Sequence, residues 1–204
     1  MVILAMSPDL ETQLQRMAAA QQVSPAQIDT SCLMPVFALS KSLSSGHWCG
    51  PHVPLRAPDL GLTWAVRVPG GVLNYVTFEM QAFWDGQDLD WKRLAMRNLA
   101  AATNNREGAR TLCRSDGKPY AVAFMYEDGL GTSRLLLRQS LEQMFPKGYK
   151  VAVPERGCGF AFSADVSAAE ARTVQGIVDR CHRHGTYPLL PGSYLSTDLE
   201  VAQS

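Results

Sequence analysis

The chain has 204 residues, of which 46% are hydrophobic and 19% are charged. This balance supplies enough apolar side chains for a packed core and excludes a disordered chain. Nineteen Lys and Arg residues offset nineteen Asp and Glu residues, which argues against attraction of the whole molecule to nucleic acid or to an anionic membrane. The length corresponds to one large domain or to two small ones.

Neither a membrane span nor a secretory signal is expected. No apolar run approaches the roughly 18 residues that a transmembrane helix needs. The apolar stretch at residues 1–6 has no basic region before it, and Asp9 and Glu11 follow at once, which is unlike a signal peptide. The cysteines are odd in number and widely spaced, which favours reduced thiols in a cytoplasmic protein. They are Cys32, Cys49, Cys113, Cys158 and Cys181.

The beginning of the chain predicts helices. Residues 8–20 carry apolar side chains at helical spacing, with Ser7 in place as the N-cap. Ser24 and Pro25 repeat this start signal, so we expect a second short helix that ends before Pro35.

The next stretch predicts a linker. Residues 40–61 are rich in Ser, Gly and Pro, which is typical of irregular structure. After this stretch, β-rich runs and amphipathic segments alternate. The sequence therefore predicts an N-terminal helical arm with a linker over residues 1–60, and an α+β main domain over residues 61–204.

In the main domain one arrangement is expected three times, a β-hairpin followed by a helix. Each hairpin is inferred from two β-rich runs that flank a turn. This order predicts an α+β fold of mostly antiparallel strands with helices on a face, and it leaves open whether the hairpins join one sheet. The hairpins pair residues 63–68 with 72–78, 111–114 with 120–126, and 149–153 with 158–163; the helices cover about 89–103, 133–145 and 167–184.

The last of these helices has the clearest apolar face. Ser167 and Glu170 fit a capping box at its start. Val174, Ile177 and Cys181 follow on one stripe at helical spacing. We therefore expect Cys181 to be a core thiol.

Asn98 interrupts the buried face of the helix at 89–103, which Trp91, Leu94 and Ala95 mark. A buried amide has to be hydrogen-bonded, because an unpaired one costs about 1–3 kcal/mol. Two interpretations stay open: a structural bond to the backbone of a neighbouring loop, or a donor in the floor of a pocket.

Two clusters contain residue types that bind metals. Neither includes a CxxC pair, and residues 182 and 184 would point to different sides of a helix. We therefore expect no metal and no cofactor. The clusters are His47, Cys49 and His52, and Cys181, His182 and His184.

A pocket with reactive groups is a further candidate. Cys158 is the best candidate nucleophile, because Arg156 is near enough in the sequence to lower its pKa, although a strand cysteine between glycines is more often a core residue. The turn at residues 129–133 lacks the P-loop lysine, yet it can seat an anion at a helix start beside Arg134. The candidate pocket comprises Asn98, Arg134, Arg156 and Cys158.

Charge is unevenly distributed along the chain. Residues 79–90 hold four acidic residues and no basic one, whereas residues 91–118 hold seven basic residues and two acidic ones. Such segregation suits either a solvated helix face or an acidic protein partner. Arg93, Arg97 and Arg106 are the expected partner-binding residues, and nucleic acid is disfavoured because aromatic residues are not interleaved with the basic ones.

Three stretches together resemble an uncharacterised bacterial family, often called YtpQ-like. They are LDWKRLAMRNL at 89–99, DGLGTSRLLL at 128–137 and VAVPERGCGFAF at 151–162. The resemblance covers about residues 85–165; Leu130 stands where the family usually has an aromatic residue, and Gly157 where it tends to have Asp. It implies a bacterial cytosolic α+β protein without an established catalytic activity, and it transfers no catalytic residue.

The leading hypothesis is a non-catalytic cytoplasmic binding protein. One version is an immunity or accessory protein that holds a toxin or effector through its charged face. The alternative is a small-molecule enzyme or ligand-binding domain that uses Cys158, Arg156 and either His182 or His184. The oligomeric state is left open.

Overall fold

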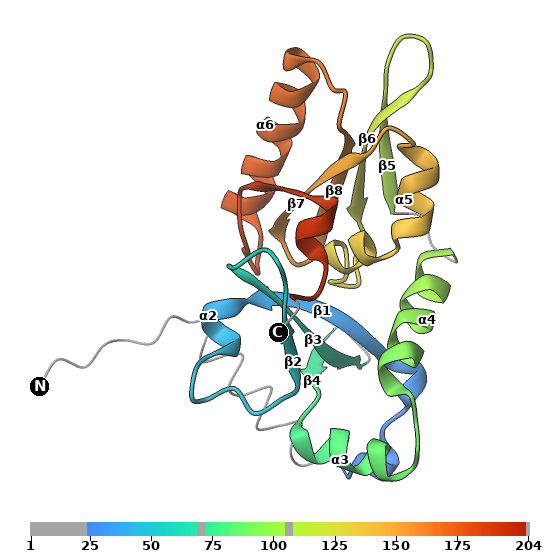
Figure 1. Cartoon of the computed structure of the whole chain (residues 1–204), viewed down its shortest axis with the longest axis vertical. Helices are drawn as coiled ribbons and strands as arrows, with labels where there is room; N and C mark the ends of the chain where they lie inside the picture. The colour runs from blue at the N-terminus through green and yellow to red at the C-terminus, as the bar shows by residue number, and fades with distance from the viewer. Residues whose placement is uncertain (1–23, 69–71, 105–107, 203–204) are drawn as a thin grey trace, which may run out of the picture.

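The strands are distributed over two antiparallel sheets, which lie one above the other along the long axis of the molecule (Figure 1). The computed structural model describes residues 24–68, 72–104 and 108–202. The helix predicted at 8–20 lies outside the described residues. Helices pack against both sheets, which confirms the predicted α+β fold.

The first sheet is built around β3 (Leu60–Arg67). Strand β1 (Leu33–Leu39) pairs along one side of β3. On the other side, β2 (His52–Pro54) and β4 (Leu73–Tyr75) pair with successive parts of it. The pairing of β3 with β4 confirms the first predicted hairpin.

The prediction of a second helix after Ser24 is wrong. After Ser24 the chain forms two single 3-10 turns, η1 (Pro25–Gln27) and η2 (Thr30–Cys32), and then enters β1. Pro35 lies within the strand, opposite Trp64. Proline is tolerated there because β1 is an edge strand, so its missing N–H can face the unpaired side.

The stretch at 40–61 is also more regular than a linker. It contains α2 (Ser40–Leu43) and β2, and it ends in the first residues of β3. Strands β1 and β2 belong to the same sheet as β3 and β4. The described part of the first 60 residues is therefore a portion of a sheet, where a helical arm and a linker were expected.

The second sheet contains the other two predicted hairpins. Its strands run in the order β5-β6-β8-β7-β9, and every neighbouring pair is antiparallel. The three hairpins are thus divided between two sheets, which the sequence had left open. The strands are β5 (Ala109–Cys113), β6 (Pro119–Met125), β7 (Tyr149–Glu155), β8 (Cys158–Ser163) and β9 (Ser193–Leu195).

In the main domain, the α-helices differ from the prediction in two places. An extra helix, α3, follows β4, where the Thr77 hydroxyl accepts a hydrogen bond from the Met80 N–H. The helix expected at 133–145 is broken at Leu137 into a 3-10 turn and a short α-helix. No helix among the described residues is both long and apolar enough to cross a membrane. The helices are α3 (Phe78–Gly86), α4 (Trp91–Asn104), η3 (Thr132–Leu136), α5 (Arg138–Met144), α6 (Ala168–His184) and η4 (Ser196–Leu199).

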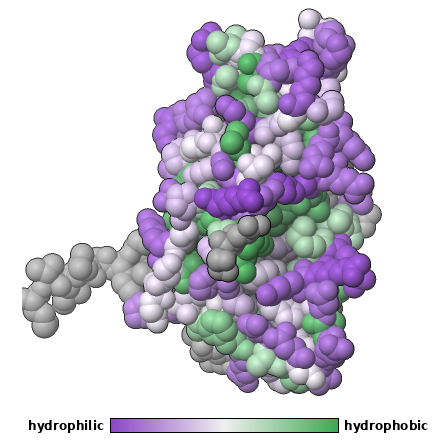
Figure 2. All heavy atoms as spheres, viewed as in Figure 1, coloured by the Kyte–Doolittle hydropathy of each residue, from purple (hydrophilic) through white to green (hydrophobic). Residues whose placement is uncertain are grey.

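The central strands of the second sheet, β6, β8 and β7, are largely buried on both faces, and successive side chains of each strand point to opposite sides. Ala121 and Ala123 of β6 pack with α6, whose Ser167–Glu170 capping box is present as predicted. Val122 of β6 instead joins a cluster that includes Phe37 of β1. The two sheets therefore share a core, and Figure 2 shows hydrophobic residues gathered at mid-height, near the level at which the sheets meet.

A segment late in the chain joins the two sheets, and we call residues 193–202 the strap. Its β9 pairs with β7 of the second sheet. Beyond η4, the backbone N–H of Arg56 donates to the Glu200 carbonyl at 2.9 Å, and that of Ala202 donates to the Pro54 carbonyl at 3.0 Å. The strap thus bonds to the second sheet and to the segment that precedes β3.

Candidate functional site

Two of the stretches that carry the sequence resemblance pack directly against each other. The Thr132 hydroxyl and backbone N–H donate to the Arg156 carbonyl at 2.8 and 3.2 Å. Gly131 lies so close to Gly157 that a Cβ at position 131 would overlap the Gly157 carbonyl. Gly131 therefore permits close backbone approach, and the segment that contains it forms one unit with the turn between β7 and β8.

Arg134 is fully buried within this unit and is neutralised there. Its guanidinium makes two hydrogen bonds to the Asp128 carboxylate, at 3.0 and 2.8 Å, and lies 3.4 Å above the ring of Tyr126. The two charged side chains are 0% and 1% exposed. The expected anion site beside Arg134 is therefore wrong, because Asp128 already supplies the anion and the following 3-10 turn is only five residues long.

Arg156 is the contrasting case, a buried cation without an anion. The residue is 5% exposed, and its guanidinium stacks 3.7 Å from the centre of the Tyr187 ring. Its Nε is buried without a hydrogen-bond partner, and no carboxylate of the described residues forms an ion pair with it. Burial of an unpaired charge costs several kcal/mol, so this arrangement is unfavourable for the protein alone.

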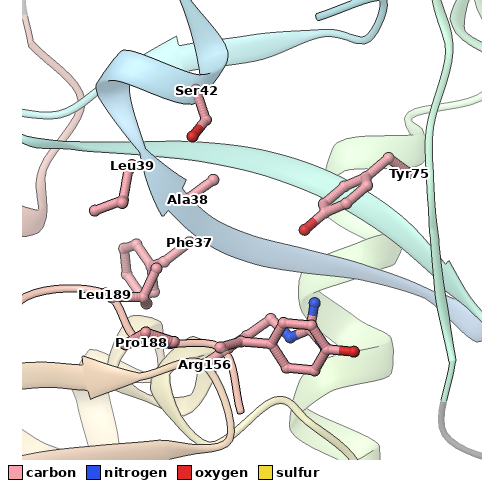
Figure 3. Close-up of a pocket in the computed structure, with 9 residues that line it drawn as sticks. Phe37, Ala38, Leu39, Ser42, Tyr75, Arg156, Pro188 and Leu189 are labelled. Carbon is pink, nitrogen blue, oxygen red and sulfur yellow. The ribbon is translucent and has the colours of Figure 1, made fainter. Parts of the chain in front are cut away.

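The Arg156 side chain lines a cavity of about 30 Å³ between the two sheets. Figure 3 shows Arg156 across the cavity from Ser42, with the hydroxyl of Tyr75 directed inward between them. Tyr75 is itself held edge-on against Trp48, with ring centres 4.9 Å apart. The lining residues are Phe37, Ala38, Leu39, Ser42, Tyr75, Arg156, Tyr187, Pro188 and Leu189.

This lining fits recognition of an anion better than a reaction. The cavity offers one cation and hydroxyl groups on an otherwise apolar wall, and it has room for about two water molecules or for one carboxylate group. A planar guanidinium binds a carboxylate through two parallel hydrogen bonds. Among the nine described lining residues there is no His, Cys, Asp or Glu to serve as a base for the Ser42 hydroxyl.

The other two members of the predicted pocket lie elsewhere. The Asn98 amide donates to the carbonyls of Thr30 and Leu33 at 2.8 and 3.0 Å. This confirms the structural interpretation, because the amide anchors the entry into β1. Cys158 faces α6, where its Sγ is 3.2 Å from the Sγ of Cys181.

The expectation that Arg156 lowers the pKa of Cys158 is wrong. The hydrogen bond with Cys181, and then burial, raise the pKa of Cys158 above its ordinary value. The pKa of Cys181 is instead lowered to about 7, mainly by the hydrogen bond from Cys158. Cys181 packs beside the α6 core cluster, as predicted, but remains partly exposed.

The two sequence clusters that contain metal-binding residue types are not gathered into one site. Within the described part of the chain, no three His, Cys, Asp or Glu side chains are grouped closely enough to hold a metal ion. His184 is exposed at the end of α6, and the ring of His52 lies 3.4 Å from the carbonyl of Gly50. Neither His182 nor His184 lines the cavity at Arg156.

The basic stretch has two exposed arginines on α4. Arg93 and Arg97 point outward, while Trp91 and Ala95 of the same helix are buried. Arg106, the third predicted partner-binding residue, lies outside the described residues. The charged face is thus accessible at residues 93 and 97.

Sequence reasoning selected Arg156 but not the residues around it. Ser42 comes from the predicted linker, Phe37 lies between the predicted second helix and that linker, and Tyr75 comes from a hairpin strand without a functional motif. Tyr187 follows the end of α6 by three residues. None of these positions carries a local signal, because the chain brings them together only through the stacking of the two sheets.

A comparison of the chain with protein-family models, with curated proteins and with solved structures finds no match. The similarity to the YtpQ-like family therefore stays a prediction.

Proposed function

We propose that this protein is a non-catalytic binding protein for a small carboxylate, which it holds at Arg156. The observation that carries the proposal is a buried guanidinium that lines a cavity and has no counter-ion among the described residues. A bound carboxylate would neutralise this charge and replace the solvation that Arg156 has lost. The Tyr75 and Ser42 hydroxyls offer further donors on the same cavity wall.

The size and charge of the cavity favour a carboxylate over a phosphate. The cavity holds one carboxylate group, with the rest of the ligand extending toward solvent past Pro188, an exposed lining residue. A phosphate dianion carries two negative charges, whereas Arg156 provides the single positive charge among the nine lining residues. Phe37 and Leu189 provide apolar contact for a short hydrocarbon portion.

Calorimetric titration with acetate, propionate and benzoate tests the proposal, with the matching amides as uncharged controls. We expect saturable carboxylate binding with a dissociation constant on the order of millimolar, as suits ligands of this size, and no binding of the amides. Arg156→Met should abolish binding, whereas Arg97→Met, which alters an exposed arginine on α4, should not. Equal carboxylate affinity of wild type and Arg156→Met would refute the assignment.

We propose as a second function that the charged face binds an acidic protein partner, as an immunity or accessory protein does with a toxin or effector. Two observations favour it: Arg93 and Arg97 are exposed on one side of α4, and arginine is enriched among residues that dominate interfaces. The charge reversals Arg93→Glu and Arg97→Glu should leave folding nearly unchanged, because exposed charges contribute about 0–1 kcal/mol.

The double charge reversal should slow association with a partner captured by pull-down and weaken its salt dependence. Binding kinetics at two salt concentrations measure both effects. Unchanged association rates at both concentrations would refute the proposal that this face binds an acidic partner.

A further inference from the structure

Two cysteine thiols from distant parts of the chain lie in contact. Cys158 begins β8 and Cys181 lies in the last turn of α6, and their sulfur atoms are 3.2 Å apart. A disulfide has its sulfur atoms about 2.05 Å apart, so a small movement of the side chains would join them. This pair lies outside the cavity at Arg156 and takes no part in the proposed carboxylate binding.

The two thiols differ in exposure and in pKa, the two properties that decide which thiol attacks in thiol–disulfide exchange. Cys181 is partly exposed and its pKa is lowered to about 7, first by the hydrogen bond from Cys158 and also by the positive charge of Arg180. Cys158 is buried at 6% exposure and its pKa is raised. Cys181 is thus the accessible thiolate at neutral pH, and Cys158 is the protected thiol beside it.

We propose that Cys158 and Cys181 form a reversible redox pair that closes into an intramolecular disulfide by exchange with a low-molecular-weight disulfide. The Cys181 thiolate attacks one sulfur of the small disulfide, which breaks its S–S bond and releases one thiolate. Cys158 then loses its proton and attacks the Cys181 sulfur, which releases the second small thiolate. The protein loses two protons and two electrons, and the small disulfide takes them up and becomes two thiols.

Incubation of the full chain with oxidised glutathione, followed by alkylation of free thiols and peptide mapping by mass spectrometry, tests this pair. We expect a linked peptide that joins Cys158 to Cys181, two hydrogen atoms lighter than the separate peptides, and its loss on addition of reduced glutathione. Cys113→Ser, which removes an exposed cysteine, should leave the result unchanged.

Two variants separate the roles of the two thiols. Cys158→Ser should accumulate a glutathione adduct at Cys181, because the resolving thiol is gone. Cys158→Ala removes the hydrogen bond to Cys181, so the pKa of Cys181 should rise and less of its thiol should be ionised at neutral pH. Alkylation of Cys181 should slow by about fivefold, because the greater nucleophilicity of the remaining thiolate offsets part of the loss. The proposal is overturned if the wild-type chain keeps both thiols alkylatable across the glutathione series, or retains the glutathione adduct at Cys181 without forming the link.

Discussion

Replacement of Arg134 by methionine should be among the most damaging single changes in this fold. The side chain is fully buried, and methionine keeps most of its volume while it removes the charge and both hydrogen bonds to Asp128. The Asp128 carboxylate, itself 1% exposed, would then lose the positive charge and the two hydrogen bonds that the guanidinium supplies. Loss of one partner from such a pair typically costs about 3–5 kcal/mol.

For a chain of this length, 1 kcal/mol corresponds to roughly 2–4 °C in melting temperature. Arg134→Met should therefore lower the melting temperature by roughly 6–20 °C in differential scanning calorimetry. The matched control is Arg138→Met, because the ion pair of Arg138 with Glu200 is partly exposed. That control should cost about 1 kcal/mol or less.

A double-mutant cycle attributes the loss to the ion pair. The combined variant Arg134→Met with Asp128→Asn should be more stable than the sum of the single effects predicts, by about 1–3 kcal/mol. Arg156→Met should lower the stability less than Arg134→Met, because it removes the stacking on Tyr187 but leaves no buried carboxylate behind without its cation. An Arg134→Met variant as stable as wild type, or a cycle with additive losses, would refute this account of the buried pair.

Three further outcomes are expected. Arg114 holds the pKa of Glu170 at about 2, below its ordinary value of 4.5. The unfolded chain therefore binds the proton more readily than the folded chain, and stability falls as the pH drops from about 4.5 toward 2. Because Arg114→Gln removes the cause of this shift, the variant should show a smaller acid-induced drop in melting temperature. Val178→Ala, at a buried position of α6, should cost about 1–4 kcal/mol in urea unfolding, whereas His182→Ala should change the free energy of unfolding little. Gly131→Ala would push a methyl group into the facing backbone carbonyl and should destabilise the chain by about 1–3 kcal/mol, which thermal melts can measure.

The elements that the sequence predicted well are those with local signals. The second and third hairpins have turn residues between two β-rich runs, and the capping box at Ser167 marks the start of α6 within one residue. Their ladders and helix hydrogen bonds are also short-range in sequence. Such elements can be inferred from the sequence because the residues that determine them are neighbours.

Strand β1 was missed for physical reasons. Its side chains are buried on both faces from Leu33 to Ala38, so it shows none of the alternation that identifies a half-exposed strand. Pro35 within it argues against a central strand, and only the pairing with β3 shows that β1 lies at an edge.

Some residues of the candidate site could be predicted from the sequence, but their contacts in space could not. Arg134 and Arg156 were both selected, yet one is neutralised by a residue six positions away and the other stacks on a ring 31 positions away. Whether a buried arginine has an anion beside it depends on these tertiary contacts. The contact between Cys158 and Cys181 could not be predicted either, because the rest of β8, a loop and most of α6 separate the two residues in the sequence.

The strap has a consequence for how the protein is made. Residues 193–202 follow every strand that they join, so strands β1 to β8 can pair before the strap has been synthesised. Until residue 202 has left the ribosome, the hydrogen bonds of the strap are missing, and the two sheets meet through apolar side chains that include Phe37 and Val122. Exposed apolar surface in partly assembled chains is prone to aggregation, so we expect this interval of biosynthesis to be the one that depends most on chaperones.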